Sequence, residues 1–120
     1  MTIAINLAGP CLSTCDPPGG DLTHLALVTV SNTGAATAYL QACGTNPAMN
    51  EQLLVDGQWT FTGPAIACPM TPGPIVLAAG ESRLTNWFFA TGRRRIVLGV
   101  ASVQDLSDSE LAASAAVDVP

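Results

Sequence analysis

Apolar and polar residues alternate in short runs along most of the chain, and glycine, proline and asparagine separate these runs. In Thr2–Leu7 every second residue is apolar, which is the period of a half-buried β-strand. Leu22–Ser31 carries apolar residues on both faces and is typical of a more central strand. Short strands between tight turns predict an antiparallel β-sandwich or barrel rather than a helical protein.

The remaining runs extend this prediction to about seven to nine strands in one domain, residues 1–120. Asp56-Gly57 separates two runs, and this pair favours a type I′ hairpin turn because both central positions need a positive φ. Ser107 stands three residues before Glu110, as in a capping box, which predicts one or two helical turns within Asp105–Ala113. The other predicted strands are Ala36–Cys43, Glu51–Val55, Gln58–Thr62, Ile75–Leu77, Arg83–Phe89, Arg94–Val103 and Ala115–Val119.

Charged residues make up 11% of the 120-residue chain, against about 25% in an average soluble domain. This deficit indicates that a partner covers part of the surface, although an alanine-rich, lysine-free chain can also reflect genomic base composition alone. The net charge of −5 argues against nucleic-acid binding, which needs lysine and arginine to neutralise phosphates. No apolar stretch is long enough to span a bilayer, and no signal peptide is visible at Met1–Ala8.

Five short motifs, in this order, resemble small extracytoplasmic bacterial domains with an immunoglobulin-like fold. The motifs are VTVSNTG at Val28–Gly34, YLQACG at Tyr39–Gly44, LVDGQW at Leu54–Trp59, LAAGES at Leu77–Ser82 and TGRRRIVLGV at Thr91–Val100. The resemblance implies an immunoglobulin-like antiparallel β-sandwich and an extracytoplasmic location, in the periplasm or on a cell or particle surface. Such domains are commonly lipoproteins or secreted modules, and this chain departs from them because it lacks a visible export signal or lipobox.

Four cysteines suggest structural disulfides, provided that the compartment is oxidising. Four cysteines allow three pairings, of which we favour Cys43 with Cys68 and Cys11 with Cys15. The first pairing closes a loop of about 26 residues, and the chain-entropy model gives it roughly 3.5 kcal/mol of stabilisation. Zinc is the alternative, but only the Cys11-Cys15 spacing resembles a zinc knuckle, so we expect no metal.

No catalytic motif stands out, and we expect neither enzymatic activity nor a cofactor. His24 is the single histidine and lies in a strand-like run, and the chain has no Gly-x-Ser-x-Gly motif. Asp105, Asp108 and Glu110 are close in sequence, but they lack the glycine and the later bidentate glutamate of a calcium loop.

The aromatic run Trp87-Phe88-Phe89 and the basic run Arg93-Arg94-Arg95 are the candidate interface residues. Because neighbouring residues of a strand point to opposite faces, at least one of these aromatic rings points away from the main core. Aromatic residues and arginine dominate interface hot spots, so the leading hypothesis is a non-enzymatic accessory, surface or assembly subunit that packs against other proteins. The alternative is a binding module whose loops Asn46–Asn50 and Pro69–Pro74 engage a protease or a small ligand.

Overall fold

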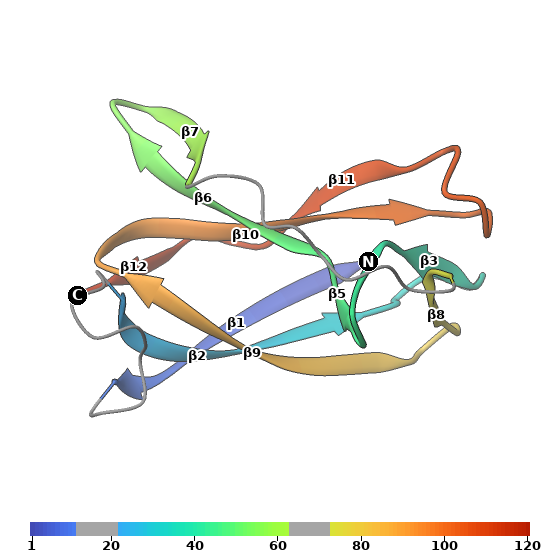
Figure 1. Ribbon diagram of the computed structural model, residues 1–120, viewed down its shortest axis with the longest axis horizontal. Coiled ribbons are helices and arrows are strands. Elements are labelled where there is room, and N and C mark those ends of the chain that lie inside the picture. Colours follow the sequence, from blue (N-terminus) through green and yellow to red (C-terminus); the bar gives the residue numbers. More distant parts are fainter. Residues whose placement is uncertain (12–21, 63–72) are drawn as a thin grey trace.

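The computed structural model describes residues 1–11, 22–62 and 73–120, and these residues form twelve β-strands and no helix (Figure 1). The prediction of an all-β antiparallel sandwich is confirmed. The strands are β1 (Thr2–Pro10), β2 (Leu22–Ser31), β3 (Ala38–Leu40), β4 (Ala42–Cys43), β5 (Asn46–Pro47), β6 (Met49–Val55), β7 (Gln58–Phe61), β8 (Ile75–Leu77), β9 (Ser82–Ala90), β10 (Gly92–Ala101), β11 (Glu110–Ala113) and β12 (Val117–Val119).

Two antiparallel sheets face each other. The smaller sheet has the order β1-β2-β9, with β2 in the centre. The larger sheet follows the path β7-β6-β10-β3-β8, and β11 and β12 also pair with β10. Because a strand has two edges and β11 overlaps both β6 and β3 along β10, β6 and β3 must share the edge of β10 opposite β11. The long strand β10 therefore pairs with four other strands and connects the larger sheet.

The core lies between the two sheets and is built from every second residue of the paired strands. Cross-strand pairs such as Val28 with Ile5 and Leu98 with Met49 place apolar side chains on the inner faces. Phe89, Val28 and Ile96 are completely buried. The buried core residues are Ile3, Ala26, Val28, Val30, Leu40, Met49, Ile75, Leu77, Phe89, Ile96, Leu98 and Val119.

The turns follow local side-chain chemistry. Asp56 and Gly57 have φ angles of 49° and 78° between the paired residues Val55 and Gln58, so the predicted hairpin turn is confirmed. After β2, the buried Asn32 accepts a hydrogen bond from the backbone N–H of Gly34 and donates to two backbone carbonyl oxygens, at 2.8 and 2.9 Å. This one amide therefore fixes the turn after β2 and holds it against β8, the strand that contains the second carbonyl.

A short detour interrupts the larger sheet between β3 and β6. Leu40 pairs with Val100 and Met49 pairs with Leu98, so the eight residues from Gln41 to Ala48 stand opposite the single residue Gly99. Within the detour, β4 and β5 pair with each other, and the N–H of Ala48 donates to the carbonyl oxygen of Gln41 at 2.8 Å. The detour is thus closed at its base and leaves the sheet as a small hairpin.

The helical turn predicted for Asp105–Ala113 is absent, and that prediction is wrong. Two successive turns, closed by backbone hydrogen bonds from Leu106 to Val103 and from Ser109 to Leu106, lead directly into β11. Aspartate side chains that bond to nearby backbone N–H groups compete with helix formation. Here Asp105 accepts from the N–H of Ser107, and Asp108 accepts from the N–H of Ser102.

These hydrogen bonds predict that the stability of the turn before β11 depends on pH. Hydrogen bonds from the Ser102 hydroxyl and N–H lower the pKa of Asp108 below its ordinary value of 3.8. A depressed pKa in the folded state means that the carboxylate stabilises the turn above about pH 4 and that this contribution is lost as the pH falls through the lowered value. We expect an NMR titration of the Asp108 carboxyl carbon to have its midpoint below 3.8, and Ser102→Ala to move the midpoint upward. A midpoint unchanged in Ser102→Ala would show that the Ser102 hydroxyl does not cause the shift, since the alanine keeps the backbone N–H.

Candidate functional site

The outward side of the β1-β2-β9 sheet is the most unusual surface of the described residues. The register of the three strands places eleven side chains on it, none of which is charged. Leu84 and Leu27 are 61% and 36% exposed there, although each is a large apolar residue. The outer face, as we call it, consists of Thr2, Ala4, Asn6, Leu25, Leu27, Thr29, Ser31, Ser82, Leu84, Asn86 and Phe88.

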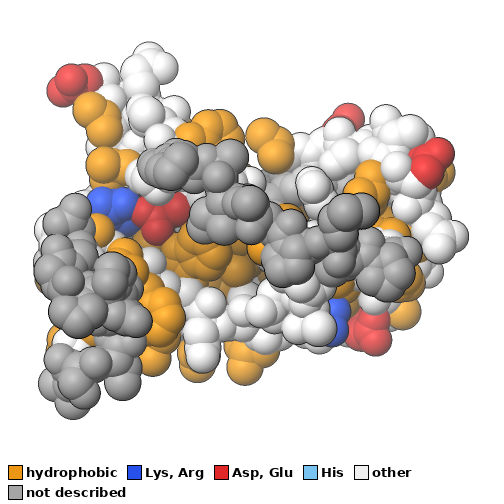
Figure 2. Space-filling view, viewed as in Figure 1, with side chains coloured by type: hydrophobic (Ala, Val, Ile, Leu, Met, Phe, Trp, Pro, Cys, Tyr) orange, Lys and Arg blue, Asp and Glu red, His pale blue; other side chains and the backbone are white. Residues whose placement is uncertain are grey.

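Charge is sparse elsewhere on the surface as well. In the view of Figure 2, acidic and basic side chains form a few separate spots between apolar and uncharged polar residues. Large apolar side chains are also exposed on the larger sheet, among them Phe61, Val76 and Leu111. The outer face differs because its exposed apolar residues lie on a sheet surface that carries no charge at all.

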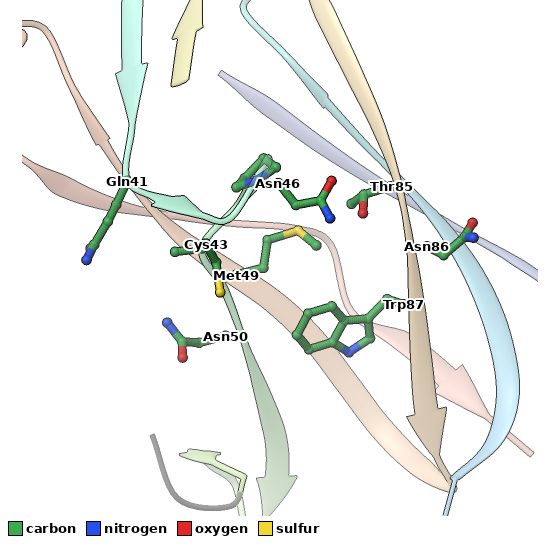
Figure 3. A pocket seen from close by; sticks show the side chains of 10 residues that line it. Gln41, Cys43, Asn46, Met49, Asn50, Thr85, Asn86 and Trp87 are labelled. Carbon is green, nitrogen blue, oxygen red and sulfur yellow. The ribbon is translucent and has the colours of Figure 1, made fainter. Parts of the chain in front are cut away.

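Two neighbouring hollows lie along β9, where the edge of the smaller sheet approaches β6 and the detour. Their volumes are about 300 and 320 Å³, and Met49 and Trp87 line both. Figure 3 shows Thr85 and Trp87 pointing from β9 toward Met49, whereas Asn86 points away. All described residues that line the first hollow are uncharged, and Glu51 is the one charged described residue that lines the second.

The carboxylate of Glu51 joins the two sheets beside the second hollow. It forms a salt bridge with Arg94 of β10 and accepts a hydrogen bond from the indole Nε1 of Trp87 on β9, at 2.9 Å. The side chains of Arg94 and Glu51 are only 10% and 9% exposed. Arg94 also donates to the carbonyl oxygen of Thr91. This charge is therefore fully engaged inside the molecule and does not give the hollow a free negative charge.

The predicted aromatic run is divided between the two sides of its sheet. Trp87 and Phe89 point inward, and Phe89 is completely buried. Phe88 pairs with Leu25 and points to the outer face, as expected for at least one ring of the run. Of the three predicted aromatic interface residues, Phe88 lies on the outer face, Trp87 is half-buried and lines both hollows, and Phe89 belongs to the core.

The predicted basic run is also divided, because alternate residues of β10 point to opposite faces. Arg93 is exposed and forms a 3.0 Å salt bridge with Asp118 of β12. Arg94 is buried in the pair with Glu51. Arg95 donates to the side-chain oxygen of Gln52, and its guanidinium lies 4.4 Å from the centre of the Trp59 ring. Most of this positive charge is satisfied within the chain and does not form one basic patch with the aromatic run.

Neither Cys11 nor Cys43 is a free thiol. The other two cysteines of the favoured pairings, Cys15 and Cys68, lie outside the described residues, so the pairing stays a prediction. Of the two predicted binding loops, Asn46–Asn50 lines the first hollow, whereas most of Pro69–Pro74 lies outside the described part of the chain.

The other candidate residues occupy ordinary structural positions. His24 is half-buried, with its Nδ1 2.8 Å from the hydroxyl of Thr23. Within residues 1–11, 22–62 and 73–120, no cluster of three or more histidine, cysteine, aspartate or glutamate residues is arranged to hold a metal. In the same ranges no helix combines the length and apolar character needed to cross a membrane.

Sequence reasoning missed two features of this region. Glu51 is the single acidic residue in the run Met49–Val55, and an acid that faces inward in an otherwise half-apolar strand signals a buried partner. The outer face could be found only by pairing three strands, because Leu27 and Leu84 are far apart in the sequence.

Fold and surface together define an all-β protein of the antiparallel sandwich class. It has an uncharged outer face and two hollows beside the β9 edge of the smaller sheet. Comparison of the chain with protein-family models finds no match, and neither does comparison with curated proteins or with solved structures.

Proposed function

We propose that this protein is a non-enzymatic accessory or assembly subunit that packs against another protein through the outer face. The observation that carries the proposal is the absence of charge from all eleven side chains of that face, together with the exposure of Leu84 and Leu27. Contiguous exposed apolar surface marks interaction sites in soluble proteins, because water contact with such a surface is unfavourable. The cores of protein interfaces are likewise depleted of charged residues.

The strand arrangement supports an immunoglobulin-like sandwich as the framework of this subunit. Strands β1, β2 and β9 form one sheet, and the chain crosses to the other sheet after β2 and again after β9. Alternation of this kind between two facing sheets is typical of immunoglobulin-like domains. A bacterial origin and an extracytoplasmic location belong to the same proposal. Structural disulfides are expected only in an oxidising compartment, and intact-mass measurement with and without reductant shows whether the cysteines are oxidised.

The second candidate is the loop-mediated binding module. The observation that favours it is the first hollow, whose wall is formed by residues 46–48 of the detour, the first two residues of β6 and part of β9. A volume of about 300 Å³ is at the lower end of the range for small-molecule sites. Replacement of residues 42–47 by a short turn would remove the part of this wall that the detour supplies. Partner binding that survives the replacement would exclude this second candidate while leaving the outer face as the binding surface.

Leu84→Lys tests the leading proposal, and Leu111→Lys is its matched control. Leu84 is 61% exposed on the outer face and Leu111 is 69% exposed on β11, so both substitutions add one charge at similarly accessible positions. We expect Leu84→Lys to weaken assembly about tenfold or more, equivalent to about 1.4 kcal/mol, because a charge must then be buried in an apolar contact. Leu111→Lys should assemble like the wild type.

Co-purification of the partner measures assembly of the Leu84→Lys and Leu111→Lys variants. Contact at the outer face is detected separately, in cells that produce the protein with a photo-reactive benzoylphenylalanine at residue 84 or at residue 111. The proposal requires a cross-linked protein adduct from residue 84 that is absent from residue 111 and that Leu27→Lys reduces. Size-exclusion chromatography with light scattering shows whether the adduct is a second copy of this chain. Equal cross-linking from both positions, or none from residue 84 in a protein that stays monomeric at high concentration, would refute it.

A further inference from the structure

Strand β9 exposes a row of backbone hydrogen-bonding groups along one edge. Immediately before β9, the carbonyl oxygen of Glu81 accepts from the N–H of Asn32, and near the end of β9 the carbonyl oxygen of Phe89 accepts from the hydroxyl of Thr23. Both contacts show that odd-numbered residues direct their backbone groups toward β2. Because backbone groups alternate along a strand, those of Leu84, Asn86 and Phe88 point to the opposite edge.

That edge has no backbone partner among the described residues. The β1-β2-β9 sheet ends at β9, and no hydrogen bond joins the outward backbone groups of Leu84, Asn86 and Phe88 to another described element. The strand contains neither proline nor lysine, and Arg83 at its start is its one charged residue. Natural proteins usually protect a long edge with such residues or with a bulge, because an unprotected edge pairs with other chains.

Open space lies beside part of this edge. The two hollows are lined by Thr85, Asn86, Trp87 and Phe88, four consecutive residues of β9, so open volume follows the edge for that length. A strand added to the sheet would turn every second side chain toward these hollows and the others toward the outer face. Met49 and the ring of Trp87 offer apolar contact to the side chains that turn inward.

We propose that β9 accepts a β-strand from a partner protein and thereby extends the outer face by one strand. This inference rests on the proposed function, because the strand belongs to the protein that covers the outer face. Backbone hydrogen bonds supply the affinity in such strand addition, and the pockets for alternate side chains supply the specificity.

The chemistry of the site defines the strand that it takes. The described lining of the first hollow has no charge, and the single charge of the second, Glu51, is already paired with Arg94. A charged side chain entering either hollow would lose water without gaining a partner. The accepted segment is therefore extended and uncharged, with apolar residues at alternate positions and small or uncharged polar residues between them.

The experiment uses a peptide of this chemistry, and its sequence is taken from the chain's own first strand. A fluorescein-labelled peptide with the sequence of residues 2–8, TIAINLA, has apolar residues at alternate positions and no charged side chain. The control peptide has the same composition with its large apolar residues adjacent. We expect saturable binding of the first peptide to the wild-type protein by fluorescence anisotropy, and binding at least about tenfold weaker for the control.

Asn86→Pro and Asn86→Thr form the matched pair of variants. Proline removes the N–H that points to the open edge and leaves the bonds to β2 intact, a position that sheets tolerate. Threonine replaces the same side chain and keeps the N–H. We expect Asn86→Pro to weaken peptide binding about tenfold and Asn86→Thr to bind like the wild type. Equal affinity of both variants, or equal binding of both peptides, would overturn the proposal.

Hydrogen exchange of the wild-type protein keeps the proposal testable if Asn86→Pro does not fold. Addition of the residue 2–8 peptide should slow exchange at the amides of Leu84, Asn86 and Phe88 and leave that of Leu111 unchanged. Unchanged exchange at these three amides would exclude strand addition. Leu27→Lys, on the outer face but away from the edge of β9, separates the two proposals: loss of cross-linking from residue 84 in that variant together with failure of the peptide experiments supports the outer face and refutes the edge.

Discussion

Glu51→Ala lowers the free energy of unfolding by about 3–5 kcal/mol, the cost of leaving one member of a buried ion pair without its partner. Arg94 stays 10% exposed between the sheets, and its remaining hydrogen bonds go to the carbonyl oxygen of Thr91, which does not neutralise its charge. The indole N–H of Trp87 loses its acceptor at the same time. Equilibrium unfolding in urea measures the loss.

A double variant separates the cost of an unpaired charge from the worth of the pair. Glu51→Leu combined with Arg94→Met replaces both charges by apolar side chains, a change that is often neutral or stabilising at buried sites. We expect the double variant to recover most of the stability that Glu51→Ala loses. A loss below about 1 kcal/mol in Glu51→Ala would mean that the pair behaves like a surface salt bridge.

Phe89→Ala is the second substitution with a large expected effect, about 3–5 kcal/mol of stability, because it empties a fully buried site in the core. Phe88→Ala is the internal control, since this neighbouring ring is half-buried on the outer face and its removal creates no enclosed cavity. We expect the control to cost much less in thermal or urea unfolding. Similar losses in the two variants would contradict the assignment of Phe89 to the core and Phe88 to the surface.

The strand pattern was predictable because alternation is a local property. Residues 2–7 and 22–31 carry their period-two signal within a few positions, and the corresponding strands β1 and β2 contain these residues. The hairpin turn at Asp56-Gly57 was equally local, since a positive φ at both positions is a requirement of the turn itself.

Features that depend on distant pairings were not predictable in this way. The run Ala36–Cys43 was expected to be one strand, but it divides into β3 and β4 where the detour begins. The position of that division depends on where β10 pairs with β3 and β6, which the sequence of the run does not contain. The expected helical turn failed for a local reason instead, because aspartate side chains took the backbone N–H groups of Ser102 and Ser107.

The interface prediction shows the same limit. Alternation along a strand predicted that at least one of the rings Trp87, Phe88 and Phe89 points away from the core, and Phe88 does so. Which ring this would be, and that Arg94 would be buried while Arg93 is exposed, could not be read from the two runs themselves. The identity of Glu51 as the partner of Arg94 depends on the pairing of β6 with β10. The outer face was likewise recognisable only after three strands had been aligned.

The detour between β3 and β6 has an evolutionary consequence. Because the chain leaves the larger sheet at Leu40 and rejoins it at Met49 opposite neighbouring parts of β10, insertions or deletions between these points do not shift the register of either strand. The N–H of Ala48 and the carbonyl of Gln41 hold the two ends together whatever lies between them. Mutations in the detour can therefore change the wall of the first hollow without altering the strand pairing of the two sheets. Related proteins can in this way bind different partners with the same fold.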